Sequence, residues 1–213
     1  MIKSEIISYV KGQTPREDKN QRFHNRYLEA VIEGVIKEMY SDLYKINPGL
    51  LDLYTKTYGN VTPVAVSLER TTGIYYSTLP VNIINLPCKS SGVRQIYPLT
   101  KSTGNIFQPM DATEADLIFN TDVAVVTNKV GYRVKQNSRV DYYNMNASII
   151  SSGVIMDLLI PFSVYADTDV VLIPELTEKE GGTFIDRVMK VLGLVPPADL
   201  QDDNAAPKAQ PKK

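Results

Sequence analysis

The chain of 213 residues has very little of the chemistry from which catalytic and metal sites are usually built. It contains one histidine, His24, one cysteine, Cys88, and no tryptophan. A single cysteine excludes a disulfide within the chain, and the His and Cys clusters that hold zinc need several such residues. A catalytic triad would have to use His24, whose neighbours Arg22 and Arg26 are cations rather than an orienting carboxylate.

Glycine motifs that bind nucleotides are also missing, because the glycines form neither G-x-G-x-x-G nor a P-loop. We therefore expect no catalytic residue, no cofactor and no metal ligand, and we expect that the protein is not an enzyme. A metal site made from carboxylates alone stays open, although no spacing of Asp and Glu favours one. The loose acidic cluster between Asp167 and Glu180 is typical of a solvated surface.

Long apolar runs are absent as well. The most apolar stretch, from Val154 to Phe162, is interrupted by Asp157, whereas a helix needs about 20 apolar residues to span a bilayer. The start of the sequence has no continuous apolar region of the kind found in signal peptides. The formal net charge of −1 disfavours a main role in binding nucleic acid through its phosphates. We expect a protein made in the cytoplasm, without a membrane partner.

The region 1–58 is predicted to be helical, with a short helix at each end. Residues 2–11 favour a helix that ends at Gly12. Residues 48–58 favour a second short helix, with Gly59 as its C-terminal cap.

A long helix is predicted between these two. Thr14, Pro15 and Glu17 have the spacing of a capping box with proline at the first helical position. From there the helix is predicted to continue to Ile46, where the sequence Asn-Pro-Gly follows. At about 1.5 Å per residue it would be on the order of 45 Å long.

From residue 59 to 174 the sequence changes to the pattern that is typical of strands. A helical interruption is predicted at 111–119, because Asp111 and Glu114 have the spacing of a capping box. The most apolar segment, Gly153–Ile160, is predicted to be a central strand. The other strands are predicted at 64–68, 74–79, 93–99, 122–126, 130–135 and 139–143.

The C-terminal part is divided into a helical region and a tail. The region 175–195 contains a predicted helix that is capped by Thr183 and extends to about Leu192. The tail, 196–213, is rich in Pro, Ala, Asp and Lys, a composition that is disordered in isolation. The sequence therefore predicts an α+β fold, in which helices flank a mainly antiparallel β module.

The long helix has two adjacent apolar ridges at i, i+4 spacing, which make its apolar side wider than the stripe of about 100° expected of a helix on one core. Two interpretations are open. The helix lies in a crevice between the β module and the C-terminal helix of its own chain, or one side contacts a neighbouring subunit. The interface candidates on these ridges are Tyr27, Leu28, Val31, Ile32, Val35, Ile36, Met39 and Tyr40.

Several segments, none of them specific by itself, together resemble a known family through their order and spacing. They are Arg22–Leu43, Tyr75–Pro80 with Leu86-Pro87, Gly92–Ile96, Val154–Phe162, and Pro196-Pro197 followed by Asp202-Asp203-Asn204. This pattern resembles the head-to-tail connector proteins of tailed bacteriophages, the adaptor or ring proteins. The resemblance is closest to those of short-tailed and crAss-like phages of Bacteroidetes.

The resemblance implies a virion structural protein of the neck or tail. Such a subunit would belong to a homo-oligomeric ring, typically twelve-fold, beneath the portal. The ring would line the channel through which double-stranded DNA passes and dock later tail components. Tails of such adaptors often reach onto the portal protein, which adds Pro196, Pro197, Asp202 and Asp203 to the interface candidates. The alternatives are another phage tail or minor capsid protein, and a non-catalytic β-rich oligomeric binding module.

Overall fold

The computed structural model describes residues 1–13, 24–99, 105–120, 129–135, 138–145, 147–174 and 182–193. The predicted α+β class is confirmed. The elements are α1 (Lys3–Gln13), α2 (Asn25–Ile46), η1 (Pro48–Tyr54), β1 (Lys56–Tyr58), β2 (Ser67–Leu68), β3 (Tyr75–Thr78), β4 (Val93–Tyr97), β5 (Gln108–Pro109), α3 (Ala112–Asn120), β6 (Gly131–Lys135), β7 (Arg139–Tyr143), α5 (Ala147–Ser152), β8 (Ile155–Leu158), η2 (Phe162–Val164) and α6 (Phe184–Val191).

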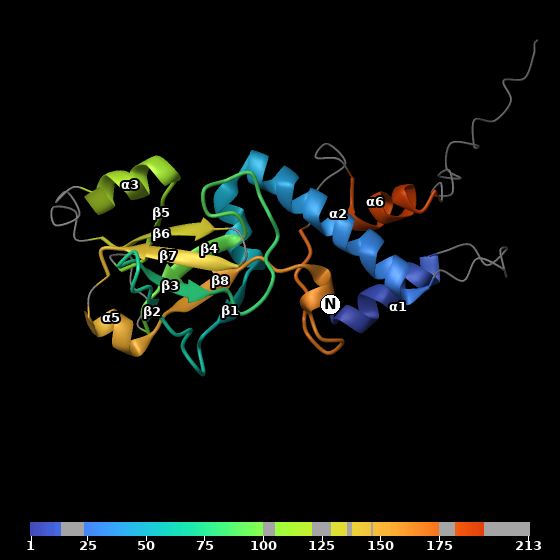
Figure 1. Ribbon diagram of the computed structural model, residues 1–213. Helices are drawn as coiled ribbons and strands as arrows, with labels where there is room; N and C mark the ends of the chain where they lie inside the picture. The colour runs from blue at the N-terminus through green and yellow to red at the C-terminus, as the bar shows by residue number, and fades with distance from the viewer. Residues whose placement is uncertain are drawn as a thin grey trace, which may run out of the picture.

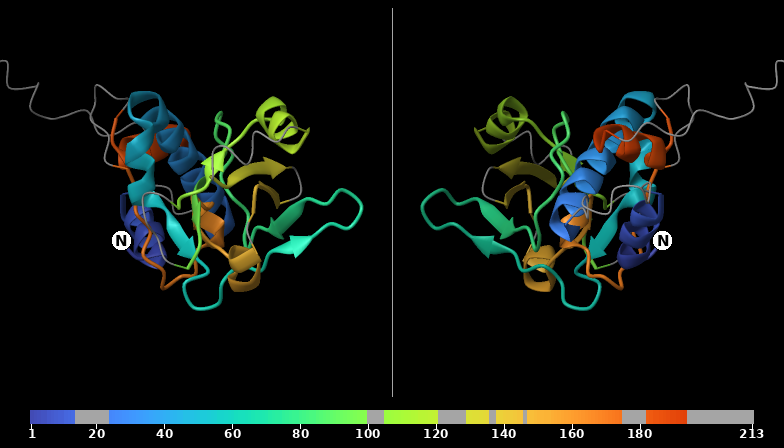
Figure 2. Two further views of the ribbon diagram at one scale, coloured as in Figure 1. Left: turned by 90° about the vertical axis from the view of Figure 1, so that its left-hand side faces the viewer. Right: turned by 90° about the vertical axis from the view of Figure 1, so that its right-hand side faces the viewer.

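The elements are arranged in a helical half and a β half. In Figure 1, α1, α2 and α6 lie together at one end, and the strands lie at the other end with α3 and α5. Figure 2 shows the hairpin of β2 and β3 projecting away from the helices. The chain crosses between the halves more than once, since α6 returns to the helical half after the last strand.

The long helix α2 is shorter than predicted. It begins at Asn25, because His24 has extended backbone angles (φ −63°, ψ 139°). The prediction of one continuous helix from Thr14 is therefore wrong at His24, and the proposed capping box at 14–17 lies outside the described residues. The helix ends at Ile46 as predicted, and its 22 residues give a length of about 33 Å.

The prediction of a single short helix over 48–58 is wrong. The 3₁₀ helix η1 begins after Asn47, whose Oδ1 accepts a hydrogen bond from the Gly49 N–H (3.0 Å). Thr55 then has extended backbone angles (φ −84°, ψ 151°), and β1 follows as a strand paired with β8. Pairing with a strand far along the chain outweighs the local helix preference of these residues.

The smaller sheet has the strand order β1-β8-β4, and both pairs are antiparallel. β8 is the central strand, as predicted from its apolar sequence, and all of its residues are buried. Asp157 is its one polar residue, and its Oδ1 accepts hydrogen bonds from the hydroxyls of Thr57 in β1 (2.6 Å) and Tyr97 in β4 (3.3 Å). This carboxylate therefore links the central strand to both neighbours.

The larger sheet has the order β2-β3-β7-β6-β5, and its β5–β6 pair is parallel. The predicted strands at 130–135 and 139–143 are confirmed as β6 and β7, whereas the strand predicted at 122–126 lies outside the described residues. The capping box of α3 is confirmed, because Asp111 and Glu114 each accept a hydrogen bond from the other's backbone N–H at 2.9 Å. Helix α5 was not among the predicted elements.

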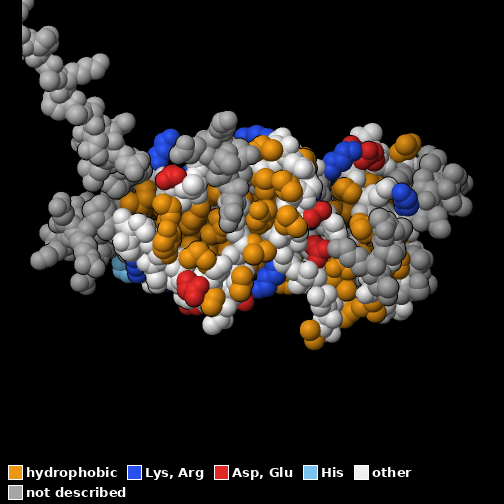
Figure 3. Space-filling view, turned by 180° about the vertical axis from the view of Figure 1, so that it is seen from behind, with side chains coloured by type: hydrophobic (Ala, Val, Ile, Leu, Met, Phe, Trp, Pro, Cys, Tyr) orange, Lys and Arg blue, Asp and Glu red, His pale blue; other side chains and the backbone are white. Residues whose placement is uncertain are grey.

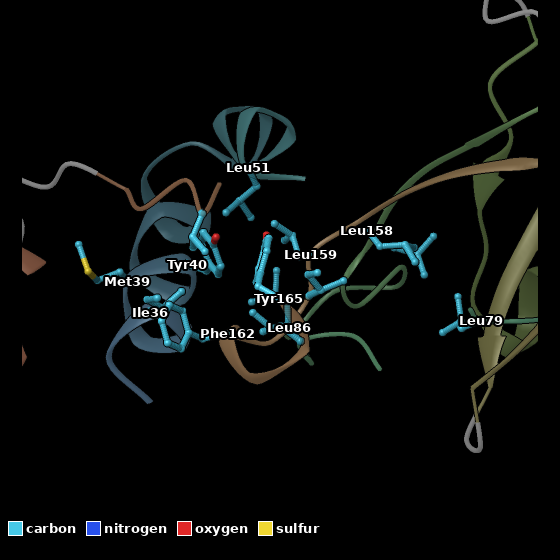
Figure 4. Packing of buried hydrophobic residues seen from close by; sticks show 14 of the residues in the cluster. Ile36, Met39, Tyr40, Leu51, Leu79, Leu86, Leu158, Leu159, Phe162 and Tyr165 are labelled. Atoms are coloured by element: carbon cyan, nitrogen blue, oxygen red, sulfur yellow. The ribbon is translucent and has the colours of Figure 1, made fainter. Parts of the chain in front are cut away.

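One hydrophobic core joins the two halves. In Figure 4, Ile36 and Tyr40 of α2 point toward Phe162 and Tyr165, whereas Met39 lies on another side of the helix. α2 contacts α6, η1, η2 and α1 of the same chain. The helix is therefore packed on more than one side by segments that are distant from it in sequence.

The predicted C-terminal helix is confirmed as α6. Thr183 caps it, and its hydroxyl accepts a hydrogen bond from the Asp186 N–H (3.4 Å) in a capping box. Its buried Arg187 attaches it to α2 through an ion pair with Asp42 (Nη1 to Oδ2, 2.8 Å). Val188, which is fully buried, adds apolar contact to this attachment.

Candidate interaction surface

The interface candidates on α2 are located in the core of their own chain. Leu28, Val31, Ile32, Val35, Ile36, Met39 and Tyr40 are at most 9% exposed, and only Tyr27 is well exposed. The structure therefore supports the crevice interpretation over contact of these ridges with a neighbouring subunit. The physical reason is that α6, η1, η2 and α1 of the same chain all pack against α2. The tail candidates Pro196, Pro197, Asp202 and Asp203 lie outside the described residues.

A shallow groove of about 430 Å³ lies along the exposed side of α2. Ala30 and Gly34 lie along it, with Arg26 and Lys37 also in the lining. Glu33 lines it as well, and its Oε2 accepts a hydrogen bond from a backbone N–H of η2 (3.1 Å). Carboxylates and cations of this kind are typical of a solvated helix face.

Exposed aliphatic side chains are found instead where α2 ends and η1 begins. Ile46 is 52% exposed, Leu50 40% and Leu53 65%, whereas Leu51 between them is fully buried. Because a 3₁₀ helix has three residues per turn, Leu50 and Leu53 lie on the same face of η1. The space-filling view in Figure 3 shows hydrophobic side chains gathered over the helical half of the face seen from behind.

A small groove of about 160 Å³ lies next to η1, and we call it the aromatic groove. It is lined by Tyr54, Thr55, Lys56, Tyr165, Asp169, Val170 and Leu172. Val170 is 62% exposed and Leu172 47%, so this side of the groove is open and apolar. The ring of Tyr54 packs against the ring of Tyr40, with 5.9 Å between their centroids. The Tyr40 hydroxyl in turn donates to the carbonyl oxygen of Leu172 (3.2 Å).

The two aromatic side chains that line this groove, Tyr54 and Tyr165, both pack against the hydrophobic core. Tyr165 is nearly buried, and burial raises the pKa of its hydroxyl to about 12. Burial also raises the pKa of Tyr40, which holds Tyr54 in place. Tyr165 and Tyr40 therefore stay uncharged over the whole neutral range, and the groove keeps an aromatic, apolar wall.

The charges around η1 and the aromatic groove are paired within the chain. Lys56 Nζ lies 2.6 Å from Asp169 Oδ2 and 5.4 Å from the centroid of the Tyr165 ring. The hydrogen bond from Lys56 lowers the pKa of Asp169 below its ordinary value. Asp52, within η1, forms an ion pair with Arg94 (2.9 Å). Local neutralisation of this kind leaves an apolar surface with a polar rim, which is the composition of a protein interface.

A second, larger groove of about 690 Å³ lies between the segment 79–91 and the end of β6, with Ser138 also in its lining. Lys89 and Lys135 line it, but both are engaged by carboxylates. Lys89 pairs with Glu114 (2.7 Å) and Asp111 (3.3 Å), and Lys135 pairs with a carboxylate of β7. Its cations are therefore already used to hold the surrounding elements together.

That carboxylate of β7 is Asp141, which is fully buried and also pairs with Arg139. The guanidinium of Arg139 donates to both carboxylate oxygens of Glu69 (3.1 and 2.8 Å) and lies 4.4 Å from the centroid of the Tyr76 ring. The hydrogen bonds from Arg139 lower the pKa of Glu69 to about 2. This cluster fastens the β2–β3 hairpin to the sheet, and its role is structural.

Within the part of the chain that the structure describes, no group of three His, Cys, Asp or Glu side chains is placed to hold a metal ion. His24 is exposed at the start of α2, and Cys88 is half-buried, with its Sγ 3.3 Å from the carbonyl oxygen of Ser91. No helix among the described residues is long and apolar enough to cross a bilayer.

Comparison of the chain with protein-family models, with curated proteins and with solved structures gives no match. The surface at η1 was not among the sequence-based candidates. Its signal in the sequence is the order Leu50-Leu51-Asp52-Leu53 after Asn47. In a helix with three residues per turn, these three leucines cannot all face the core.

Proposed function

We propose that the protein is a structural subunit of a phage virion, one subunit of a head-to-tail connector ring beneath the portal. The observation that carries the proposal is the exposed apolar surface formed by η1 and the aromatic groove, whose surrounding charges are paired within the chain. The resemblance of the segment order to connector proteins supports the same function. The ring would line the DNA channel and dock tail components.

The size of the apolar surface fits an assembly better than an isolated pair of subunits. Ile46, Leu50, Leu53, Val170 and Leu172 are 40–65% exposed. Full burial of an aliphatic side chain contributes about 1.5–3 kcal/mol, so covering the exposed part of all of them contributes on the order of 5 kcal/mol. Association of two proteins costs about 4–15 kcal/mol in lost freedom. Closure of a ring adds one contact beyond those of an open chain of the same subunits, which partly offsets this cost.

The overall charge suits a channel wall. Each phosphate that a protein neutralises strengthens its hold on DNA and makes the binding more dependent on salt. A net charge of −1 gives little general attraction for the duplex. DNA could therefore slide through a ring of such subunits during packaging and ejection.

Electron microscopy of the purified protein, alone and mixed with the portal protein, tests the proposal. Closed rings with a central hole wide enough for duplex DNA are expected in at least the mixture. A compact monomer in both samples, with no attachment to the portal, would contradict the proposed function.

A matched pair of variants tests the surface that carries the proposal. Leu53→Asp places a charge on the exposed face of η1 and is expected to reduce the oligomer fraction, measured by light scattering after size-exclusion chromatography. Val61→Asp is the control, because Val61 is 97% exposed in the loop before β2. Both variants should keep the circular dichroism spectrum of the folded protein. Equal oligomer fractions for the two variants, under conditions in which the natural protein forms oligomers, would exclude η1 as a contact.

A further inference from the structure

We propose that the aromatic groove of one subunit receives residues 194–200, the segment in which the tail begins, from a second copy of the chain. The second copy rests on the proposed ring function, whereas the groove and the segment are features of this chain. The segment is Leu-Val-Pro-Pro-Ala-Asp-Leu, which has aliphatic residues around a pair of prolines and one charge. It begins directly after Gly193, the last described residue beyond α6.

The lining of the groove matches a proline-containing segment. Consecutive prolines favour the polyproline II conformation, which loses little entropy when it binds. Protein domains that bind such segments do so through grooves lined with aromatic side chains. The aromatic groove provides the rings of Tyr54 and Tyr165, and Val170 and Leu172 provide an open aliphatic side.

The charges also match. Asp199 is the only ionisable residue of the segment 194–200. Lys56 lines the groove, where its ammonium already contacts Asp169. A lysine ammonium has three donors, so Lys56 can contact a second carboxylate without losing the first.

The course of the chain favours a second copy over the subunit's own tail. In Figure 1, α6 runs away from η1, so the described chain ends at the far side of the helical half. The prolines follow within four residues of Gly193, and a chain spans at most about 3.3–3.6 Å per residue. Because α6 is directed away from η1, we take a neighbour's groove as the partner. Contact between two different surfaces is the kind that builds rings.

Disulfide trapping between two differently tagged, co-expressed full-length chains tests this inference. Both chains carry Cys88→Ser, one carries Val170→Cys in the groove, and the other carries Ala198→Cys in the tail. Mild oxidation is expected to link the two tags covalently. The control replaces Val170→Cys by Thr113→Cys on the exposed part of α3, which should give no link above background. Adding Pro196→Gly and Pro197→Gly to the tail chain should reduce the linked product.

Three other outcomes would contradict the inference: an intrachain disulfide, linking that does not depend on the prolines, and no linking. An intrachain disulfide in the double variant Val170→Cys/Ala198→Cys, without links between tags, would place the tail in its own groove. Linking that is unchanged by the glycine substitutions would remove the role of the prolines. Rings seen by electron microscopy without any link would refute the docking but leave the proposed function standing. Monomers without rings and without links would refute both.

Discussion

Replacement of Val35 or Ile36 by alanine is expected to weaken folding rather than assembly. The two side chains lie on different ridges of α2, because Val35 is in line with Val31 and Ile36 is in line with Ile32. They are 1% and 2% exposed. Loss of a buried methylene costs about 0.8 kcal/mol in transfer free energy, and the cavity left behind adds to this cost. Ile→Ala substitutions in cores cost about 2–5 kcal/mol, and we expect roughly 2 kcal/mol for Val35→Ala on the same grounds.

Urea unfolding followed by circular dichroism measures the effect at two protein concentrations. With an m-value of about 2 kcal/mol/M, a loss of 2 kcal/mol lowers the midpoint by about 1 M. Lys37→Ala on the exposed side of α2 is the control and should change the unfolding free energy by less than about 0.5 kcal/mol. The reasoning is refuted if Val35→Ala or Ile36→Ala keeps the midpoint of the natural protein yet dissociates its oligomer. That ridge would then be a subunit contact.

Two ion-pair clusters give further predictions. Glu69 has a pKa of about 2 in the folded protein, below its ordinary value of 4.5, so its stabilising contact with Arg139 is complete above pH 4.5 and is lost as the pH falls toward 2. As the pH is lowered through this range, the unfolding temperature should therefore fall more steeply for the natural protein than for Glu69→Gln. Parallel curves of unfolding temperature against pH would contradict the lowered pKa of Glu69. Arg187→Ala removes a hydrogen bond to a carboxylate and should cost about 1.5–3 kcal/mol. Adding Asp42→Ala should then cost less than Asp42→Ala costs alone, because the two side chains share one contact. Full additivity in a double-mutant cycle would contradict that coupling.

The sequence predicted the helices α3 and α6, because the capping residues that begin them are close together in the chain. The capping residues of α3 and α6 lie within three positions of the groups they bind, so their spacing could be recognised directly. The apolar composition of β8 predicted its central place for a similar reason. The strand at 56–58 was missed because it depends on pairing with β8, about a hundred residues away.

The width of the apolar side of α2 indicated packing on more than one side, but it left open whether the partners are the C-terminal helix and the β module of the same chain or a neighbouring subunit. The partners include α6 and η2, which follow in the chain only after the whole β region. A helical pattern contains no information on which distant segment will cover it. The exposed face of η1 was missed for a second reason: its leucines were assigned to an α-helix, and a 3₁₀ helix distributes them differently.

Because the α2 ridges are buried, a ring of this chain would have to use other surfaces for its subunit contacts. A ring needs two different surfaces on each subunit, so that each contact leaves one surface of either kind free for the next neighbour. A single helix ridge that paired with itself would instead close a two-fold dimer and stop. The aromatic groove and the C-terminal end of α6 lie at different places on the helical half, because α6 runs away from η1. The packing that buries the apolar side of α2 also fixes the direction of α6. It does so through the Arg187–Asp42 ion pair and the buried side chain of Val188. The compact helical half is therefore a precondition for the proposed head-to-tail contact.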